Sequence, residues 1–261
     1  MQVALKQYQV KLAETEEERL GAQRLRYRVF VEEMGAAVSE AARTARLEQD
    51  AFDPYFDHLI LTAEAPVADP LDRVVGVYRL MRREAARSGI GFYGAAEYDL
   101  GLIETAPRES LELGRSCVAA AHRGGPGMHL LWQGLADYVL ERDIEILFGA
   151  ASFPGVDPAP LAEALSFLHH RHLAPPELRV RARAERRLPM DLTPPEAIDP
   201  VRALAAIPSL IKAYLRLGGA VGEGAVIDRD FNTIDVCLVM DTARMKAQAR
   251  AFYARGRGRA G

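Results

Sequence analysis

The spacing of apolar residues predicts a chain of alternating strands and helices. Strict alternation of apolar and polar residues is typical of a half-buried strand, and apolar residues three or four positions apart are typical of an amphipathic helix. The alternation predicts strands over residues 3–12, 58–63, 74–81, 110–120, 144–153 and 225–240. The longer spacing predicts helices over residues 15–30, 128–142, 159–171 and 210–217, with a last helix after residue 240. This order predicts an α/β fold with a mixed central sheet and helices on both faces.

Residues that typically begin or end helices support several of these boundaries. Thr15 followed by Glu18 has the sequence of a capping box, which begins a helix, and Gly218 is of the residue type that ends one. The last third is divided into short pieces by Pro175, Pro176, Pro189, Pro194, Pro195 and Pro200. We therefore expect a core over residues 1–174 and a C-terminal α+β elaboration over residues 175–261 that packs on the core as one structural unit.

Composition and charge exclude several classes of protein. The chain has 261 residues, of which 49% are hydrophobic and 26% are charged, values typical of a soluble globular protein. A formal net charge of −3 argues against a dedicated nucleic-acid binder, which needs a broad basic surface. No stretch reaches the roughly 18 apolar residues of a membrane span, and the N-terminus lacks the apolar region of a signal peptide. We expect a cytoplasmic protein and leave peripheral contact with the inner membrane open.

We expect neither a disulfide nor a metal site. The two cysteines, Cys117 and Cys237, each lie within an apolar run and are interpreted as reduced core residues. The sequence HHRH places His169 and His172 three residues apart on a predicted helix, but no acidic residue or cysteine has the spacing of a further ligand.

A glycine-rich turn, HRGGPG at residues 122–127, joins a predicted strand to a predicted helix. Free backbone N–H groups and the positive end of a helix suit a phosphate group. An ordinary turn between a strand and a helix has the same residue types, so the turn alone does not decide between the two interpretations.

Charged residues gather in four segments that precede this turn. They are Arg26 and Arg28, Asp50 and Asp53, Arg79, and Glu112 with Arg115. Each segment has a structural interpretation: a solvated helix face, a loop cap, an exposed strand residue and an ion pair within one strand. Exposed ion pairs contribute only about 0–1 kcal/mol to stability. No single segment therefore indicates a site.

The glycine turn resembles the acyl-donor loop of the GNAT acyltransferase superfamily, whose pattern is [Gln/Arg]-x-x-Gly-x-[Gly/Ala]. His122, Gly125 and Gly127 occupy the three motif positions, with His122 in place of the usual Gln or Arg. The resemblance implies a GNAT-like fold and a loop that receives the phosphate of an acyl donor. A phosphopantetheine arm on a carrier protein has one phosphodiester, so it needs fewer phosphate contacts from this loop than coenzyme A, which has a pyrophosphate.

The charged segments together resemble the acyl-homoserine-lactone synthases, which are GNAT-like enzymes. The matching residues are Arg26, Phe30, Asp50, Asp53, Arg79, Glu112 and Arg115. The tryptophan that those synthases carry soon after the phenylalanine is absent, and Gly35 and Ala36 stand in that area.

Two longer blocks, residues 131–158 and 208–241, resemble a sister family, the ornithine acyl-carrier-protein N-acyltransferases. This resemblance covers roughly residues 7–253. It implies transfer of a 3-hydroxyacyl group from acyl carrier protein to the α-amine of L-ornithine, which gives lyso-ornithine lipid. The donor is then a phosphopantetheine thioester, and no cofactor is bound tightly.

For this reaction we assign roles to the matching residues as hypotheses. Glu112 accepts the proton of the attacking amine, because only a free amine attacks a thioester; a structural pair with Arg115 is the competing interpretation. Asp50 and Asp53 are candidates to hold the ammonium group of the acceptor. Arg79 or Arg115 is a candidate to bind its carboxylate in a two-pronged hydrogen bond. Backbone N–H groups near Cys117 and Val118 would stabilise the oxyanion.

A basic surface is expected to receive the acidic carrier protein. Residues 178–187 alternate arginine with apolar residues, so a strand there would place Arg179, Arg181 and Arg183 on one face. A charged edge that deters sheet pairing is the competing interpretation. A second basic group comprises Arg82, Arg83 and Arg87.

Three alternatives remain. An acyl-homoserine-lactone synthase would consume S-adenosylmethionine, but the extended second half and the missing tryptophan argue against it. An N-acyltransferase for glycine, serine or lysine would keep the same scaffold. A module that only captures acyl carrier protein would not need Glu112, Asp50, Asp53 and Arg79 together.

Overall fold

The structure, a computed structural model, describes residues 7–244. The chain divides into two compact units, which we call unit 1 (Met1–Ile90 with Leu113–Asp143) and unit 2 (Gly91–Glu112 with Ile144–Gly261). Residues 91–112 therefore group with the second half of the chain. The expectation of a core over 1–174 and an elaboration over 175–261 stays a prediction. The first six residues of the chain and the helix expected after residue 240 lie largely outside the described residues.

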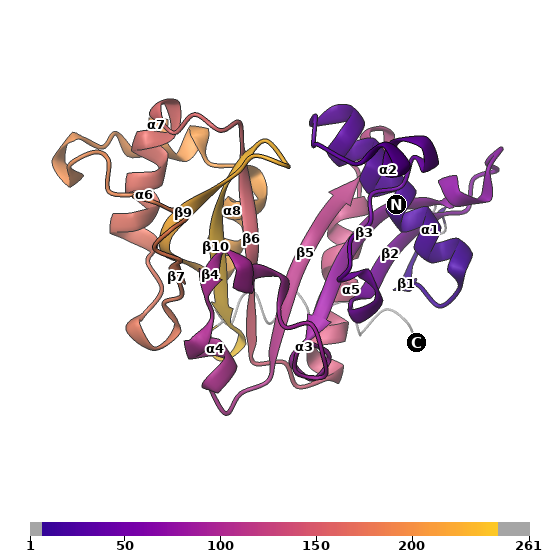
Figure 1. The fold of residues 1–261 in the computed structure, drawn as a ribbon, viewed down its shortest axis with the longest axis horizontal. Helices are drawn as coiled ribbons and strands as arrows, with labels where there is room; N and C mark the ends of the chain where they lie inside the picture. Colours follow the sequence, from indigo (N-terminus) through magenta and orange to yellow (C-terminus); the bar gives the residue numbers. More distant parts are fainter. Residues whose placement is uncertain (1–6, 245–261) are drawn as a thin grey trace. The chain divides into compact units, whose positions relative to one another are not determined.

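Unit 1 is a sheet with helices on both of its faces (Figure 1). The strand order is β1-β2-β3-β5, with antiparallel pairing of β1 with β2 and of β2 with β3. The strands are β1 (Tyr8–Leu12), β2 (Asp57–Ala63), β3 (Val74–Arg82) and β5 (Ser110–Val118), of which β5 enters unit 1 at Leu113. The α-helices are α1 (Glu16–Arg26), α2 (Glu40–Ala45), α3 (Arg83–Arg87) and α5 (Gly127–Glu141). A π-helix, η2 (Tyr27–Glu33), and the 3₁₀ turns η3 (Asp53–Tyr55), η4 (Pro70–Arg73) and η6 (Ala120–His122) complete the unit.

The first helix begins where its sequence predicts. The Thr15 side chain accepts a hydrogen bond from the Glu18 backbone N–H, and the Glu18 carboxylate accepts one from the Thr15 backbone, which completes the capping box. The chain then passes without a break from α1 into the π-helix η2, which extends the helical segment to Glu33. Short π segments are frequent at functional sites because they shift the phase of the helix face.

The two helical layers pack on alternate residues of the same strands. Ile60 and Val77 join the α1 residues Ala22 and Leu25 in one buried cluster. Gly76, the residue before Val77 in β3, faces the other side: a Cβ added to it would lie 2.9 Å from the Leu131 side chain of α5, so α5 packs closely there. Because successive strand residues point to opposite faces, α1 and α5 cover opposite faces of the sheet in unit 1.

Unit 2 is a second set of strands with its own helices. Its strand order is β5-β6-β10-β9-β7-β4, with β8 beside β9. The strands are β4 (Tyr98–Asp99), β6 (Ile146–Pro154), β7 (Arg181–Ala182), β8 (Arg187–Leu188), β9 (Ala220–Asp228) and β10 (Thr233–Asp241). The α-helices are α4 (Gly101–Thr105), α6 (Ala162–His172), α7 (Pro200–Ala206) and α8 (Ser209–Leu217). Short 3₁₀ turns are η5 (Tyr93–Ala96), η7 (Ala159–Leu161), η8 (Pro176–Leu178), η9 (Pro195–Ala197) and η10 (Thr242–Arg244).

Pairing within the chain is mixed, which confirms the predicted α/β class. Ser110–Glu112 of β5 pair in parallel with Ile146–Phe148 of β6, and β6 pairs antiparallel with β10. Gly218 ends α8 in a left-handed conformation with φ of 100°, as predicted from its residue type.

The prediction of one strand over residues 225–240 was wrong, because the segment is a hairpin of β9 and β10. The turn between them uses polar residues that the apolar pattern ignored. The Asp228 carboxylate accepts hydrogen bonds from the backbone N–H groups of Asp230 and Phe231, and Asn232 has a positive φ of 55°. Asp and Asn favour turns for these reasons.

The continuous strand over residues 178–187, which would have placed three arginines on one face, is not formed. Within this range, Arg181–Ala182 form the short strand β7 after the turn Pro176–Leu178, and Arg187 begins a separate short strand, β8. The arginines are held within unit 2: Arg181 pairs with Glu223 at 3.0 Å, and Arg179 and Arg183 donate to the carbonyl oxygens of Ala174 and Ala95. Internal bonding, and not a shared strand face, fixes these side chains.

None of the helices within residues 7–244 combines the length and the apolar character needed to cross a membrane.

Candidate functional site

Six charged side chains form one network in unit 1, which we call the charged cluster. It contains three arginines and three carboxylates: Arg26, Arg79, Arg115, Glu48, Asp50 and Asp53. The side chains of Arg26 and Arg79 are fully buried. The formal charges of the six groups sum to zero, which is the condition for burying ions at tolerable cost.

Arg26 is bound on every side of its guanidinium. Its Nη1 and Nη2 donate to the two carboxylate oxygens of Asp53 at 2.8 and 3.0 Å, a two-pronged pair. Its Nε donates to the Glu48 carboxylate, and Nη2 also donates to the Glu48 backbone carbonyl at 2.6 Å. The solvated helix face that was one interpretation of Arg26 is therefore excluded.

Arg79 connects the two aspartates. Its Nη1 lies 2.8 Å from both carboxylate oxygens of Asp50 and 2.7 Å from Oδ1 of Asp53. The guanidinium also lies over the Phe56 ring, with its carbon 4.3 Å from the ring centroid. Such a cation–π contact adds stabilisation when the cation is removed from water.

Arg115 closes the cluster through Glu48. Its Nε donates to Glu48 at 3.2 Å, and its Nη2 lies 3.4 Å from Asp50. Glu48 was not among the predicted site residues, because it lies in a polar loop with no periodic pattern. The predicted residues were already balanced, with three arginines and the carboxylates of Asp50, Asp53 and Glu112, so a count of charges did not reveal it.

The three carboxylates of the cluster differ in how far they are exposed to solvent. The side chains of Glu48 and Asp53 are 5% and 8% exposed, whereas that of Asp50 is 22% exposed. The Asp50 carboxylate is also fixed in place by a hydrogen bond from the Phe52 backbone N–H. Asp50 is therefore the most exposed carboxylate of the cluster.

Electrostatics hold the buried groups in defined ionisation states. Burial alone would raise the pKa of Asp53, but Arg26 and Arg79 outweigh it and hold that pKa well below its usual range. Burial lowers the pKa of His58, and the nearby Arg26 lowers it further. The His58 Nε2 lies 3.2 Å from the Asp53 backbone carbonyl, which suits a neutral imidazole that donates from Nε2.

The backbone at Arg115 is unusual for a strand. Its φ is +49°, in the left-handed region that residues other than glycine rarely adopt. Residues held in such conformations persist only where surrounding contacts determine them. The ion pairs of Arg115 with Glu48 and Asp50 supply such contacts.

Glu112 belongs to unit 2 and is held by the backbone. Its two carboxylate oxygens accept hydrogen bonds from the N–H groups of Tyr93 and Gly94 at 2.7 and 2.6 Å. A Cβ on Gly94 would lie 3.0 Å from Oε1, so glycine allows this close approach. The residue is buried and precedes Arg115 by three positions in β5.

The glycine turn joins β5 to α5, as its sequence predicts. Gly124 has a φ of +76°, and α5 begins at Gly127 with no side chain capping its first turn. The first N–H groups of a helix lack partners within the helix and can bind an anion. At the start of this turn, the His122 Nδ1 is hydrogen-bonded to the Tyr8 hydroxyl at 2.8 Å.

Comparison with known proteins identifies the family. Residues 25–133 match the acetyltransferase (GNAT) domain. The chain is 54% identical over 254 residues to an L-ornithine N(alpha)-acyltransferase of Rhodobacter capsulatus, covering 96% of this chain and 97% of that protein. It is 44% identical over 253 residues to a protein of the same name from Rhizobium meliloti, covering 96% and 86%.

The chain belongs to the L-ornithine N(alpha)-acyltransferase family. It is an acyltransferase, as the sequence predicts. Two solved structures share its fold: FeeM, an N-acyl amino acid synthase from uncultured soil microbes (TM-score 0.53, 12% identity, 94% of this chain and 97% of that chain), and the CoA-dependent acyl-homoserine lactone synthase MesI (TM-score 0.50, 16% identity, 97% of both chains).

In this acyltransferase, the structure brings together Arg26, Asp50, Asp53, Arg79 and Arg115, and adds Glu48. Phe30, in η2, packs against the buried cluster that contains Cys117. Both cysteines are free and buried, and burial raises the pKa of the Cys117 thiol to about 12, so it behaves as a core residue. Val118 accepts a hydrogen bond from Arg123 through its carbonyl oxygen.

The remaining sequence motifs have structural partners. His170 lies 2.9 Å from Asp191, and within residues 7–244 no group of three or more histidine, cysteine or acidic side chains is arranged to hold a metal ion. Arg82 pairs with Glu84 at 3.5 Å on the surface.

The left-handed backbone at Arg115 leads to a test with two matched variants. Arg115→Gly and Arg115→Ala both remove the guanidinium, so any difference between them reports the backbone. In an ordinary strand, glycine is about 0.5–1 kcal/mol less favourable than alanine. At a φ of +49° we expect the reverse, with the glycine variant more stable by about 1 kcal/mol. Urea unfolding measures the difference, and an alanine variant of equal or greater stability would contradict a strained left-handed backbone at this position.

The neutral, buried His58 predicts a dependence of stability on pH. Its pKa is lowered in the folded state, so below about pH 6.5 the unfolded chain binds a proton that the folded chain does not. The contribution of neutral His58 to the free energy of unfolding is therefore fully present above pH 6.5, and it falls as the pH decreases from 6.5 towards the lowered pKa. We expect His58→Gln to reduce the loss of unfolding free energy between pH 7 and 5.5 by on the order of 1 kcal/mol. Equal losses in both proteins would show that His58 is protonated in the folded state.

Proposed function

We propose that this acyltransferase moves a 3-hydroxyacyl group from acyl carrier protein to the α-amine of L-ornithine, giving lyso-ornithine lipid. The observation that carries the proposal is the 54% identity, over nearly the whole chain, to an L-ornithine N(alpha)-acyltransferase. The charged cluster supports it, because an amino-acid acceptor carries both an ammonium and a carboxylate group that need partners of opposite charge.

Exposure suggests how the charged cluster receives the acceptor. Asp50 is its most exposed carboxylate and holds the ammonium group of the acceptor in this proposal, whereas Asp53 is committed to Arg26 and Arg79. Arg115, with 11% of its side chain exposed, binds the acceptor carboxylate more readily than Arg79, which is fully buried. The remaining members keep these two groups in place.

The proposed chemistry is nucleophilic attack by the free α-amine on the thioester carbonyl. Glu112, directly or through one water molecule, accepts the proton that the amine loses. Its hydrogen bonds from Tyr93 and Gly94 fix the orientation of the carboxylate. Backbone N–H groups near Cys117 and Val118 stabilise the tetrahedral oxyanion, which typically lowers the barrier by about 3–4 kcal/mol per donor. The carbon–sulfur bond then breaks, and the proton passes to the phosphopantetheine thiolate.

The donor is held through its phosphopantetheine arm in this proposal. The turn that contains His122, Gly125 and Gly127 places backbone N–H groups at the start of α5, where one phosphodiester can bind. We propose a cytoplasmic location with peripheral contact with the inner membrane, because the product is amphiphilic. No tightly bound cofactor takes part in the reaction.

The direct test is an assay of the purified protein with 3-hydroxyacyl carrier protein and a panel of acceptors, with products identified by mass. The panel contains L-ornithine, lysine, glycine, serine and S-adenosylmethionine. We expect an acyl-ornithine as the main product. A lactone formed with S-adenosylmethionine alone would indicate an acyl-homoserine-lactone synthase instead. Tight binding of the carrier protein with no product from any acceptor would indicate a binding module.

The proposed base leads to a specific prediction. Glu112→Gln keeps the shape of the side chain but cannot accept the proton, so we expect kcat to fall by at least about 100-fold. Glu109→Gln is the matched control, because Glu109 is exposed and lies three positions earlier. Thermal unfolding of both variants checks that the fold is intact. A folded Glu112→Gln protein that keeps a rate near that of the unsubstituted enzyme would remove Glu112 from the mechanism.

A further inference from the structure

The segment from Ala119 to Gly127, which we call the donor loop, contains two polar side chains, His122 and Arg123; its other residues are alanine, glycine or proline. A donor phosphate at this loop can therefore meet these two side chains or backbone N–H groups. How the two side chains are bonded decides which contacts remain for the donor.

His122 is turned towards the first strand. Its Nδ1 shares a hydrogen bond of 2.8 Å with the Tyr8 hydroxyl, and the two rings meet edge to face with centroids 5.6 Å apart. This arrangement commits one ring nitrogen to the protein itself.

Arg123 is held by two separate contacts. Its Nε donates to the Val118 carbonyl at 2.8 Å, and its Nη2 lies 2.6 Å from the Glu33 carboxylate. Glu33 is the last residue of the π-helix η2, so the helix supplies the anion that pairs with the cation of the loop. Both side chains are partly exposed, at 46% for Arg123 and 37% for Glu33. The pair is therefore within reach of a ligand, and a partly exposed pair of this kind changes the affinity for an anion by at most about 1 kcal/mol, which is about fivefold.

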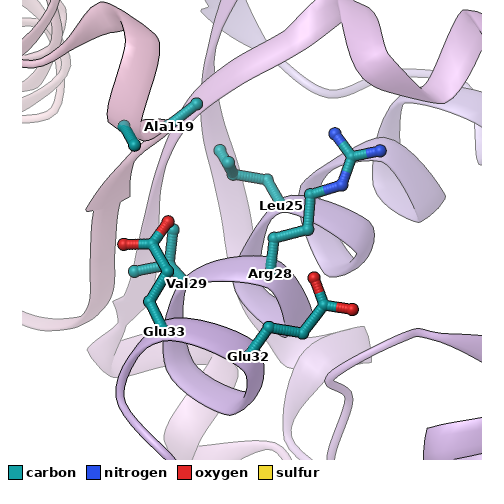
Figure 2. Close-up of a pocket in the computed structure, with 7 residues that line it drawn as sticks. Leu25, Arg28, Val29, Glu32, Glu33 and Ala119 are labelled. Atoms are coloured by element: carbon teal, nitrogen blue, oxygen red, sulfur yellow. The ribbon is translucent and has the colours of Figure 1, made fainter.

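A cavity of about 300 Å³ separates η2 from the start of the donor loop. Its lining includes Glu32 and Glu33 on one side and Ala119 and Ala120 on the other. Figure 2 shows the Glu33 side chain on the side of the cavity where Ala119 lies, and the Glu32 side chain on the side where Arg28 lies. Glu32 pairs with Arg46 at 2.6 Å, away from the donor loop in sequence.

We propose that Glu33 is a donor-specificity residue that acts through Arg123. By pairing with Arg123, it withdraws the one permanent cation of the donor loop, so the contacts left for the donor phosphate are backbone N–H groups and the second ring nitrogen of His122. This arrangement suits the single phosphodiester of a carrier-bound phosphopantetheine arm. It disfavours coenzyme A, whose pyrophosphate and 3′-phosphate gain most from a guanidinium. The inference rests on the proposed use of a phosphopantetheine donor and extends it to a residue outside the loop motif.

The neighbouring carboxylate provides a matched control. Glu33→Gln and Glu32→Gln remove the same charge from adjacent residues that line the same cavity, but only the first releases Arg123. The double variant Glu33→Gln, Arg123→Gln removes the released cation as well. A gain in affinity for coenzyme A that depends on Arg123 appears only in Glu33→Gln, whereas a gain caused by the change in net charge appears in Glu32→Gln as well.

The experiment measures the affinity of each variant for coenzyme A by isothermal titration calorimetry, without an acceptor. We expect Glu33→Gln to bind coenzyme A about fivefold more tightly than the unsubstituted protein and than Glu32→Gln, and the double variant to lose that gain. Equal affinity in Glu33→Gln and the unsubstituted protein, or the same gain in Glu32→Gln, would overturn the inference. Because no acyl transfer is measured, failure of the proposed ornithine acylation appears separately, as the absence of acyl-ornithine in the product assay.

Discussion

The pairing of three guanidinium groups, two of them fully buried, with three carboxylates is the constraint on which the charged site of unit 1 depends. Removing an isolated ion from water costs several kcal/mol even after the protein relaxes, so each member of the charged cluster requires its partners. The members come from α1, the loop before β2, β3 and β5, and their pairing fixes these four segments relative to one another within the unit. The fold of unit 1 and the geometry of the site are therefore two results of one electrostatic arrangement.

The same arrangement separates residues that support the site from those that a substrate can meet. Arg26 and Arg79 are fully buried and both pair with Asp53, whereas Asp50 and Arg115 retain exposed surface. A buried, fully paired group has little free energy to gain from a ligand, because binding would only replace existing contacts. Asp50 and Arg115 are therefore the members of the cluster to which we assign the two charges of the amino-acid acceptor in the proposed reaction.

Much of this architecture could be predicted from local patterns. The capping box at Thr15, the turn at Gly218 and the hairpin of β2 with β3 each follow from residues that lie close in sequence. Glu48 and the left-handed conformation of Arg115 could not be predicted, because both depend on contacts between distant segments. The hairpin of β9 and β10 was missed for a simpler reason: the apolar pattern continues on both sides of a turn whose polar residues were not considered.

The most direct measurement of this account is a double-mutant cycle on the Glu48–Arg115 pair, followed by the free energy of unfolding in urea. Glu48→Gln and Arg115→Gln each leave an unbalanced charge in the cluster, and we expect each to cost about 3–5 kcal/mol. The double variant restores the balance, with two arginines facing two aspartates. It should therefore lose at least about 1.5 kcal/mol less than the sum of the single losses. Losses that add to within about 0.5 kcal/mol would show that charge balance does not hold the cluster together.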